Sequence, residues 1–130
     1  MGINLNTLAV AETTVVHLTD ANDNKLYFND EPVTITIYGK GSKQFKQALS
    51  ELNRKSLQRK GKPQNLAVIM DDNVDYLVAI TKEASNVDNP DGTPATSEDD
   101  FKALYSNPKL FFIKDTIQAA LDDNSNFTQK

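Results

Sequence analysis

The 130-residue sequence contains no cysteine, no tryptophan and a single histidine, His17. Without cysteine the chain cannot form disulfides, thiolate zinc sites, iron–sulfur clusters or a cysteine nucleophile. With one imidazole it cannot build a site that needs two histidine ligands. Apolar residues are also scarce, at 38% against about 45–50% in typical soluble domains. The length still allows a core without covalent staples, so we expect one domain with a lean core.

Signals for export and membrane insertion are missing as well. The first residues contain no cationic segment and no apolar run of signal-peptide length. The longest uncharged stretch is far shorter than the ~18–20 residues that span a bilayer. The sequence therefore predicts a cytoplasmic protein with no membrane contact.

Basic residues are concentrated in one segment, although the net charge of the chain is −4. Residues 40–62 have a net charge of +7, with Glu51 as the only acid, which leaves −11 for the remainder. Such a field steers association with an oppositely charged partner. The segment is a solvated helix face, a protein-docking surface or a nucleic-acid surface; the last is weakened because no aromatic side chains interleave with the cations. The candidate contact residues here are Lys43, Lys46, Arg54, Lys55, Arg59, Lys60 and Lys62.

The N-terminal third has the pattern of a small antiparallel sheet. Residues 1–12 resemble a flexible arm, and residues 14–38 form a β unit interrupted by clusters of Asn and Asp that favour turns. Alternation is strictest where Val33, Ile35 and Ile37 share one face. We expect a hairpin or a three-stranded meander, with strands at 14–18, 25–28 and 33–38.

Helical periodicity dominates residues 42–122, which we predict to be the helical body. The spacing predicts four helices, at about 42–60, 64–84, 97–106 and 109–121. The second has the most regular apolar spacing, so we expect it at the centre of the core. Residues 123–130 form a polar tail. The sequence thus predicts a single α+β domain over residues 1–130, mainly helical overall.

Three loops superficially resemble binding motifs. The stretch 39–42, Gly-Lys-Gly-Ser, lacks the spacing of a phosphate loop. Residues 87–98 and 20–31 place several oxygen ligands as a calcium loop does. However, Val87 occupies the first ligand position of one, and Lys25 replaces the glycine of the other. Ordinary turn chemistry accounts for both, so we expect no nucleotide, metal or cofactor site.

Catalytic side chains are equally scarce. Asp71, Asp72 and Asp75 could serve as paired carboxylates for acid–base work, but negative charge is also favoured on the solvent face early in a helix. His17 lies in an apolar strand, where a structural histidine is commoner than a catalytic base. We therefore expect a protein that is not an enzyme.

Two aromatic positions near the C-terminus are further candidates for partner contact. Adjacent Phe111 and Phe112 cannot point into the same groove from one helix. One of them is therefore either exposed, which would mark a partner site, or covered by a neighbouring helix. Phe127 is either a latch onto the body or a hook for a partner.

The order of these elements resembles that of siphophage tail assembly chaperones. The stretch Val33–Phe45 resembles their opening of a strand, a glycine, a serine and an aromatic-led helix. Asp91–Pro94 followed by Ser97–Tyr105 resembles their downstream pattern, as does the closing helix that leads to Phe127. The likeness covers residues 14–127 and lies in the order and spacing of the motifs.

This resemblance implies a non-enzymatic protein of the host cell cytoplasm that binds the tape measure protein during tail morphogenesis and is absent from the mature virion. It also implies self-association, which the separated charges would allow as a head-to-tail oligomer or spiral. Further partners implied are a frameshift-extended form of the same chain and the tail tube protein. The alternative is a small phage nucleic-acid-binding or regulatory protein that uses the basic helix 43–60.

Overall fold

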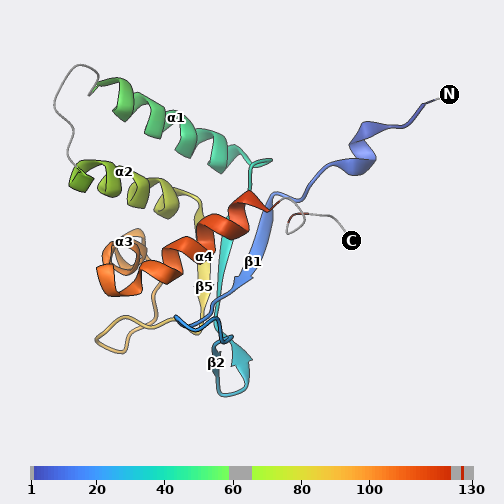
Figure 1. Ribbon diagram of the computed structural model, residues 1–130. Coiled ribbons are helices and arrows are strands. Elements are labelled where there is room, and N and C mark those ends of the chain that lie inside the picture. Colours follow the sequence, from blue (N-terminus) through green and yellow to red (C-terminus); the bar gives the residue numbers. More distant parts are fainter. Residues whose placement is uncertain (1, 59–65, 124–126, 128–130) are drawn as a thin grey trace.

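The computed structural model describes residues 2–58, 66–123 and 127, and it has an α+β fold (Figure 1). The α+β class expected from the sequence is confirmed. The strands are β1 (Thr13–His17), β2 (Tyr27–Phe28), β3 (Glu31–Pro32), β4 (Thr34–Tyr38) and β5 (Thr81–Ser85). The helices are α1 (Lys43–Gln58), α2 (Leu66–Ala79), α3 (Glu98–Ser106) and α4 (Phe111–Asp122). Two 3-10 turns, η1 (Leu5–Leu8) and η2 (Pro108–Leu110), complete the described elements.

The main sheet has three antiparallel strands in the order β1-β4-β5. Val16 of β1 faces Ile35 of β4, which in turn faces Ala84 of β5. Ile35 and Ile37 are fully buried, as the alternation in β4 predicts, because both side chains project to the face that the helices cover. Val15, on the opposite face of β1, is exposed.

Of the two arrangements expected for residues 14–38, a hairpin or a three-stranded meander, the three predicted strands do not form one meander sheet. The segment predicted at 25–28 does not join the main sheet: β2 pairs only with β3, in a separate two-stranded ribbon. His17 packs edge-on against Tyr27, and its Nε2 lies 2.8 Å from the backbone oxygen of Leu26. The histidine therefore has a structural role, joining the end of β1 to the ribbon.

The predicted helix 64–84 is too long at its C-terminal end. It ends at Ala79, and the next residues form β5, whose partner β4 would otherwise have an unpaired edge. The backbone N–H of Tyr38 donates to the carbonyl of Ile80 (2.7 Å), so the helix gives way directly to the sheet. Ile80 and Thr81 are both buried. Local periodicity could not separate the two structures because these side chains face the core in either one.

The core lies between the main sheet and the helices that cross it (Figure 1). The least exposed large side chains come from β4, from the α2–β5 junction and from α4: Ile35, Ile37, Ile80, Ile117 and Leu121. Among the described residues, no helix is long and apolar enough to cross a bilayer.

Phe127 closes one end of this core. Phe127 is 3% exposed, and its ring lies directly over Gly39, in the space that a Cβ at that position would need. Its carbonyl accepts a hydrogen bond from the backbone N–H of Ala11. Phe127 is therefore a latch onto the body. The ring covers Gly39, the first residue of the 39–42 turn that superficially resembles a phosphate loop, while Lys40 and Gly41 are exposed.

Candidate interaction surfaces

The basic helix α1 is fixed to the body by its first turn and by one apolar edge. The Oγ of Ser42 accepts from the backbone N–H of Phe45 (3.1 Å) and donates to the carbonyl of Gly39 (2.7 Å), so Ser42 is the N-cap of α1. The ring of Phe45 packs edge-on against Tyr76 of α2. Ala48 is the one fully buried residue of the helix. The opposite side of α1 therefore faces solvent.

This solvent side forms a cationic stripe, which we define by the outward-facing residues Lys43, Lys46, Gln47, Ser50 and Arg54. Their spacing of three or four residues places them on one helix face, where they line a broad, shallow depression. Arg54 pairs with Glu51 in the same helix, which lowers the pKa of Glu51. Among the residues that the structure describes, Lys43 and Lys46 form no ion pair.

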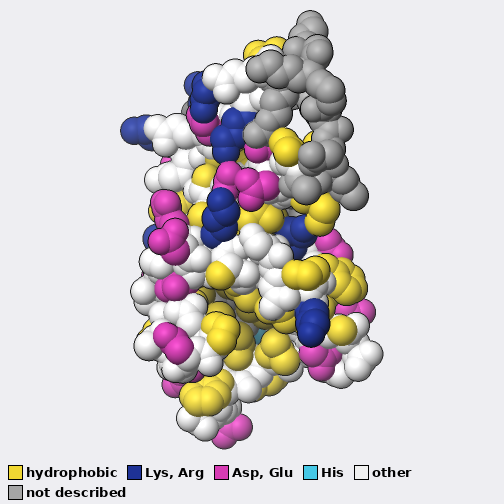
Figure 2. All heavy atoms as spheres, turned by 90° about the vertical axis from the view of Figure 1, so that its left-hand side faces the viewer, with side chains coloured by type: hydrophobic (Ala, Val, Ile, Leu, Met, Phe, Trp, Pro, Cys, Tyr) yellow, Lys and Arg dark blue, Asp and Glu magenta, His cyan; other side chains and the backbone are white. Residues whose placement is uncertain are grey.

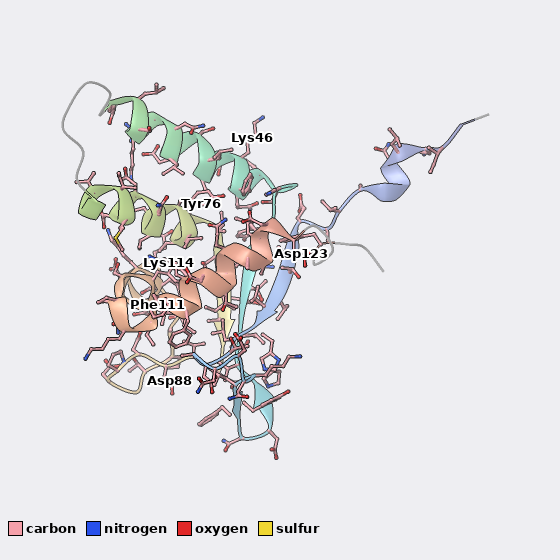
Figure 3. All side chains as sticks on the ribbon, viewed as in Figure 1. Lys46, Tyr76, Asp88, Phe111, Lys114 and Asp123 are labelled. Carbon is pink, nitrogen blue, oxygen red and sulfur yellow. The ribbon has the colours of Figure 1, made fainter. Side chains whose placement is uncertain are left out.

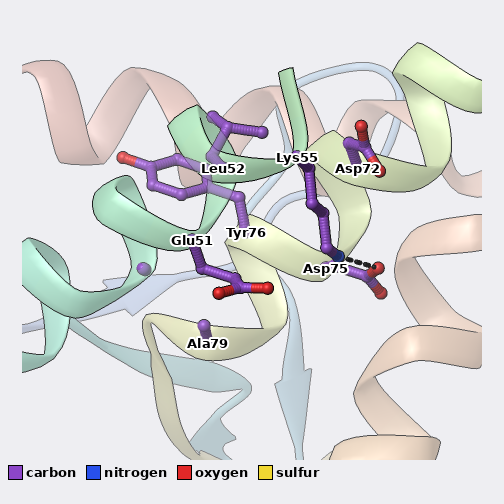
Figure 4. A pocket seen from close by; sticks show the side chains of 8 residues that line it. Glu51, Leu52, Lys55, Asp72, Asp75, Tyr76 and Ala79 are labelled. Atoms are coloured by element: carbon purple, nitrogen blue, oxygen red, sulfur yellow. Dashed lines mark hydrogen bonds and ion pairs between the residues drawn. The ribbon is translucent and has the colours of Figure 1, made fainter. Parts of the chain in front are cut away.

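Lys55, by contrast, does not belong to the outward surface. Its Nζ donates to a carboxylate oxygen of Asp75 on α2 (2.9 Å), beside a small void between the two helices (Figure 4). Lys102 of α3 reaches the other oxygen of Asp75 at 3.2 Å. Burial raises the pKa of Asp75, but the hydrogen bonds from the two lysines outweigh it and hold the pKa below its usual value. Of the other candidates in the basic segment, Arg59, Lys60 and Lys62 lie outside the described residues.

The three acids of α2 are only partly the solvent-facing set that we expected. Their carboxylate oxygens lie within 4.8 Å of one another. Asp71 is exposed and lies 3.8 Å from Lys102, whereas Asp75 is half-buried and Asp72 is buried. This correction follows from the position of α2 between α1 and α3, which leaves it little free surface. Asp71 and Asp75 therefore form ion pairs that link α2 to its neighbouring helices.

A groove lies between α3 and the loop that follows β5, with a volume of about 220 Å³. Its apolar walls come from the loop (Val87, Ala95) and from α3 and η2 (Leu104, Leu110). Figure 2 shows hydrophobic side chains gathered in and around a hollow in the lower half of the face that it displays. Exposed apolar surface of this kind is typical of protein interaction sites.

The carboxylates beside this groove are fixed by turn and cap geometry. Asp100 accepts from the backbone N–H groups of Thr96 and Ser97, and Ser97 caps α3 in return, forming a capping box. These hydrogen bonds lower the pKa of Asp100. Asp91 accepts from Thr93 across the turn that Gly92 allows with its φ of +88°. The polar side chains of the loop thus serve ordinary turn chemistry, and the groove carries negative charge.

The aromatic candidates near the C-terminus differ in their exposure to solvent. Phe111 is 59% exposed, and Phe112 is half-buried with its ring 6.0 Å from that of Phe111. Of the two alternatives left open for this pair, an exposed ring or one covered by a neighbouring helix, the structure shows the first. Phe127, as the latch, is not available as a surface hook.

The cationic stripe and the acidic groove lie at opposite ends of the molecule. Figure 3 places Lys46 on α1 at one end and Asp88, at the groove, near the other. The β2–β3 ribbon, which lies at the end away from α1, adds further acids. The acidic residues of the ribbon and its approach are Asp20, Asp23, Asp30 and Glu31. The charge asymmetry of the sequence is therefore also an asymmetry in space.

Sequence reasoning missed two features of these surfaces. Leu57, near the C-terminal end of α1, is 70% exposed and was not among the candidate contact residues. The groove was also missed, because nothing local in the loop indicates that Val87 and Ala95 fold back onto α3. The two prolines of the loop show only that it is not a helix.

No protein-family model, no curated protein and no solved structure matches this chain.

Proposed function

We propose that this chain is a non-enzymatic bacteriophage tail assembly chaperone of the host cell cytoplasm. In this proposal it binds the tape measure protein and associates with further copies of itself during tail morphogenesis, and it is absent from the mature virion. The observation that carries the proposal is the separation of an exposed cationic stripe from an acidic, partly apolar groove at the other end of the fold. The resemblance in element order over residues 14–127 supplies the biological setting.

The charge geometry suits a protein that coats a long partner. Two different surfaces at opposite ends form a head-to-tail contact that need not close, so copies can add along a rod as a chain or spiral. Exposed charge pairs contribute little energy each and are screened by salt, so such an assembly is reversible. A chaperone that must leave before the tail tube forms requires this reversibility.

The apolar surface suits an aggregation-prone partner. Phe111 is exposed next to the wall residue Leu110, and further exposed aromatics lie on the β2–β3 ribbon. Aromatic residues dominate the binding energy at protein interfaces. We expect the tape measure protein to contact this apolar surface, with the frameshift-extended form and the tail tube protein as further partners.

Co-expression tests the proposal. The test uses the tape measure protein of the same phage, and its soluble fraction is measured with and without this chain. Retention of the tape measure protein in solution, and its co-purification with the chain, is the expected result. Phe111→Asp should reduce co-purification severalfold, whereas the matched change Val15→Asp on the far face of the sheet should not. A tape measure protein that precipitates equally with and without the chain contradicts the proposal.

Nucleic-acid binding is the alternative, and the exposed cations of α1 favour it. The exposed aromatics that could stack on bases lie away from these cations, on an acidic part of the fold. A gel-shift titration at two salt concentrations separates the two functions. Salt-sensitive retardation of DNA or RNA that Lys43→Glu with Lys46→Glu abolishes would support the alternative.

A further inference from the structure

We propose that the groove between α3 and the loop after β5 receives the outward face of α1 from a second copy of the chain, with Leu57 of that copy entering the groove. This inference rests on the self-association in the proposed function and names the two surfaces that make it.

The groove is suited to bind one aliphatic side chain. Four apolar residues, Val87, Ala95, Leu104 and Leu110, form its walls. Ala95 is buried and the other three are half-buried, so the groove is shaped before any partner arrives. Its volume of about 220 Å³ accommodates a leucine side chain, whose removal from water favours association.

The rim of the groove is negatively charged, which favours a cationic partner. Two carboxylates, Asp88 and Asp100, line it. Asp100 is committed to the cap of α3, whereas Asp88 is exposed and accessible to an incoming ammonium or guanidinium group. The apolar walls with an acidic rim fit a leucine that is flanked by lysine or arginine.

The outward face of α1 has this composition. Leu57 is 70% exposed, and Lys46, Ser50 and Arg54 precede it on the same side of the helix at intervals of three or four residues. Lys46 and Leu57 are about 16 Å apart along the axis, at 1.5 Å per residue. One helix thus presents a leucine together with two cations, Lys46 and Arg54, of which Arg54 also pairs with Glu51.

Other exposed apolar segments fit the groove less well. Tyr27 and Phe28 on the β2–β3 ribbon are exposed, but Asp30 and Glu31 follow them directly. Those acids would face the acidic rim, and like charges brought together weaken association. Phe111 lies next to the groove itself. Among the described residues, α1 is therefore the segment whose charge matches the groove.

The fold also allows each copy to use both surfaces at once. The groove and α1 lie at opposite ends (Figures 1 and 3), so occupation of one does not cover the other. The contact is then heterologous, and it propagates beyond a dimer.

Disulfide trapping tests this assignment cleanly because the chain has no native cysteine. One variant carries Leu57→Cys and a second carries Ala103→Cys, at an exposed position on the groove wall. Both positions are exposed, so the folds should remain intact, which circular dichroism checks. The full-length variants are mixed under mild oxidation in low salt, and the cross-linked product is measured on a non-reducing gel. A disulfide requires Cα atoms within about 7 Å, so the reaction reports close approach.

The mixture should give a heterodimer, and the doubly substituted chain should give a ladder of oligomers. About 1 M salt should suppress both, because the Debye length falls to about 3 Å. Asp88→Lys on the groove partner should slow cross-linking about two- to fivefold. Lys46→Glu with Arg54→Glu on the helix partner should then restore the rate. Lys82→Cys, exposed on β5, is the matched control and should not cross-link to the groove variant.

Cross-linking of the Lys82→Cys control at the same rate, or only symmetric dimers of the Leu57→Cys chain, would overturn the assignment. Loss of tape measure binding in the Ala103→Cys variant, with no cross-link in the mixture, would also overturn it and assign the groove to that partner. A salt-sensitive heterodimer from a chain that fails to retain the tape measure protein would instead support the contact and contradict the proposed function.

Discussion

Helices α1 and α4 differ in a way that their lengths do not indicate. α1 has sixteen residues, of which only Ala48 is fully buried. α4 has twelve residues and buries three aliphatic side chains, Ile113, Ile117 and Leu121. Both are amphipathic, but α4 crosses the sheet, whereas α1 lies at the outer end and contacts mainly α2. α4 therefore holds the fold together, and α1 displays a surface.

The few apolar residues of the chain are distributed unevenly between these two regions. The aliphatic residues are concentrated in β4, the α2–β5 junction and α4, while α1 contributes charge. A surface helix held by one apolar edge and an ion pair can be altered without loss of the core. The stability of the two regions should accordingly respond to substitution, and to pH, in different ways.

The largest difference is expected for aliphatic truncation. Ile117→Ala should lower the free energy of unfolding by about 2–5 kcal/mol, because it leaves a cavity in a fully buried site. Leu57→Ala on α1 should change it by less than about 0.5 kcal/mol. Urea denaturation followed by circular dichroism measures both. Similar losses in the two variants would contradict the view that α4 holds the fold together and α1 does not.

The next effect concerns the latch that joins the start of α1 to the body. Gly39→Ala places a methyl group against the Phe127 ring and should destabilise the fold by about 1–3 kcal/mol. In a chain that already carries Phe127→Ala, the same change should cost much less. Hydrogen exchange at the amide of Ala11, which donates to the Phe127 carbonyl, should accelerate in Gly39→Ala. Equal costs in the two backgrounds would disprove the contact.

The free energy of unfolding should decrease at alkaline pH because of a buried tyrosine in the core. Burial raises the pKa of Tyr105 to about 12, although its hydrogen bond with Thr81 opposes the shift. The folded protein therefore keeps the phenolic proton more tightly than the unfolded chain, whose value is 10.0. This contribution is present below pH 10 and is lost as the pH rises towards 12, by up to about 2 kcal/mol. Tyr105→Phe should cost about 1 kcal/mol at neutral pH and flatten this decrease in pH-dependent urea titrations.

The smallest expected effect is on the attachment of α1, and it should show in acid. Asp75 has a lowered pKa, so its contribution is present above its unfolded value of 3.8 and is lost as the pH falls through the folded value. Asp75→Asn should cost about 0.5–1 kcal/mol at neutral pH and remove that acid dependence. Amide exchange should quicken in α1 more than in α4. An equal change in both helices would show that the ion pair supports the whole fold.

Much of the fold could be predicted from local patterns. Ser42 and Ser97 cap α1 and α3 as their sequences indicate, and the alternation in β4 predicted the burial of Ile35 and Ile37. The end of α2 could not be predicted in this way. Residues 80–84 satisfy both a helical and an extended pattern, and the free edge of β4 decides between them. The same holds for Lys55, whose pairing with Asp75 depends on how α1 and α2 pack.

Composition and local pattern were enough to predict the four helices, the strands β1 and β4, the absence of thiol chemistry and the concentration of positive charge in one helix. These properties follow from composition and short-range periodicity, which need no knowledge of distant neighbours. The three-dimensional structure was needed to show that Phe127 is a latch, that Phe111 is exposed and that the loop after β5 forms a groove on α3. It also placed the cations and the groove at opposite ends. Each of these depends on contacts between residues far apart in the chain, which local pattern does not encode.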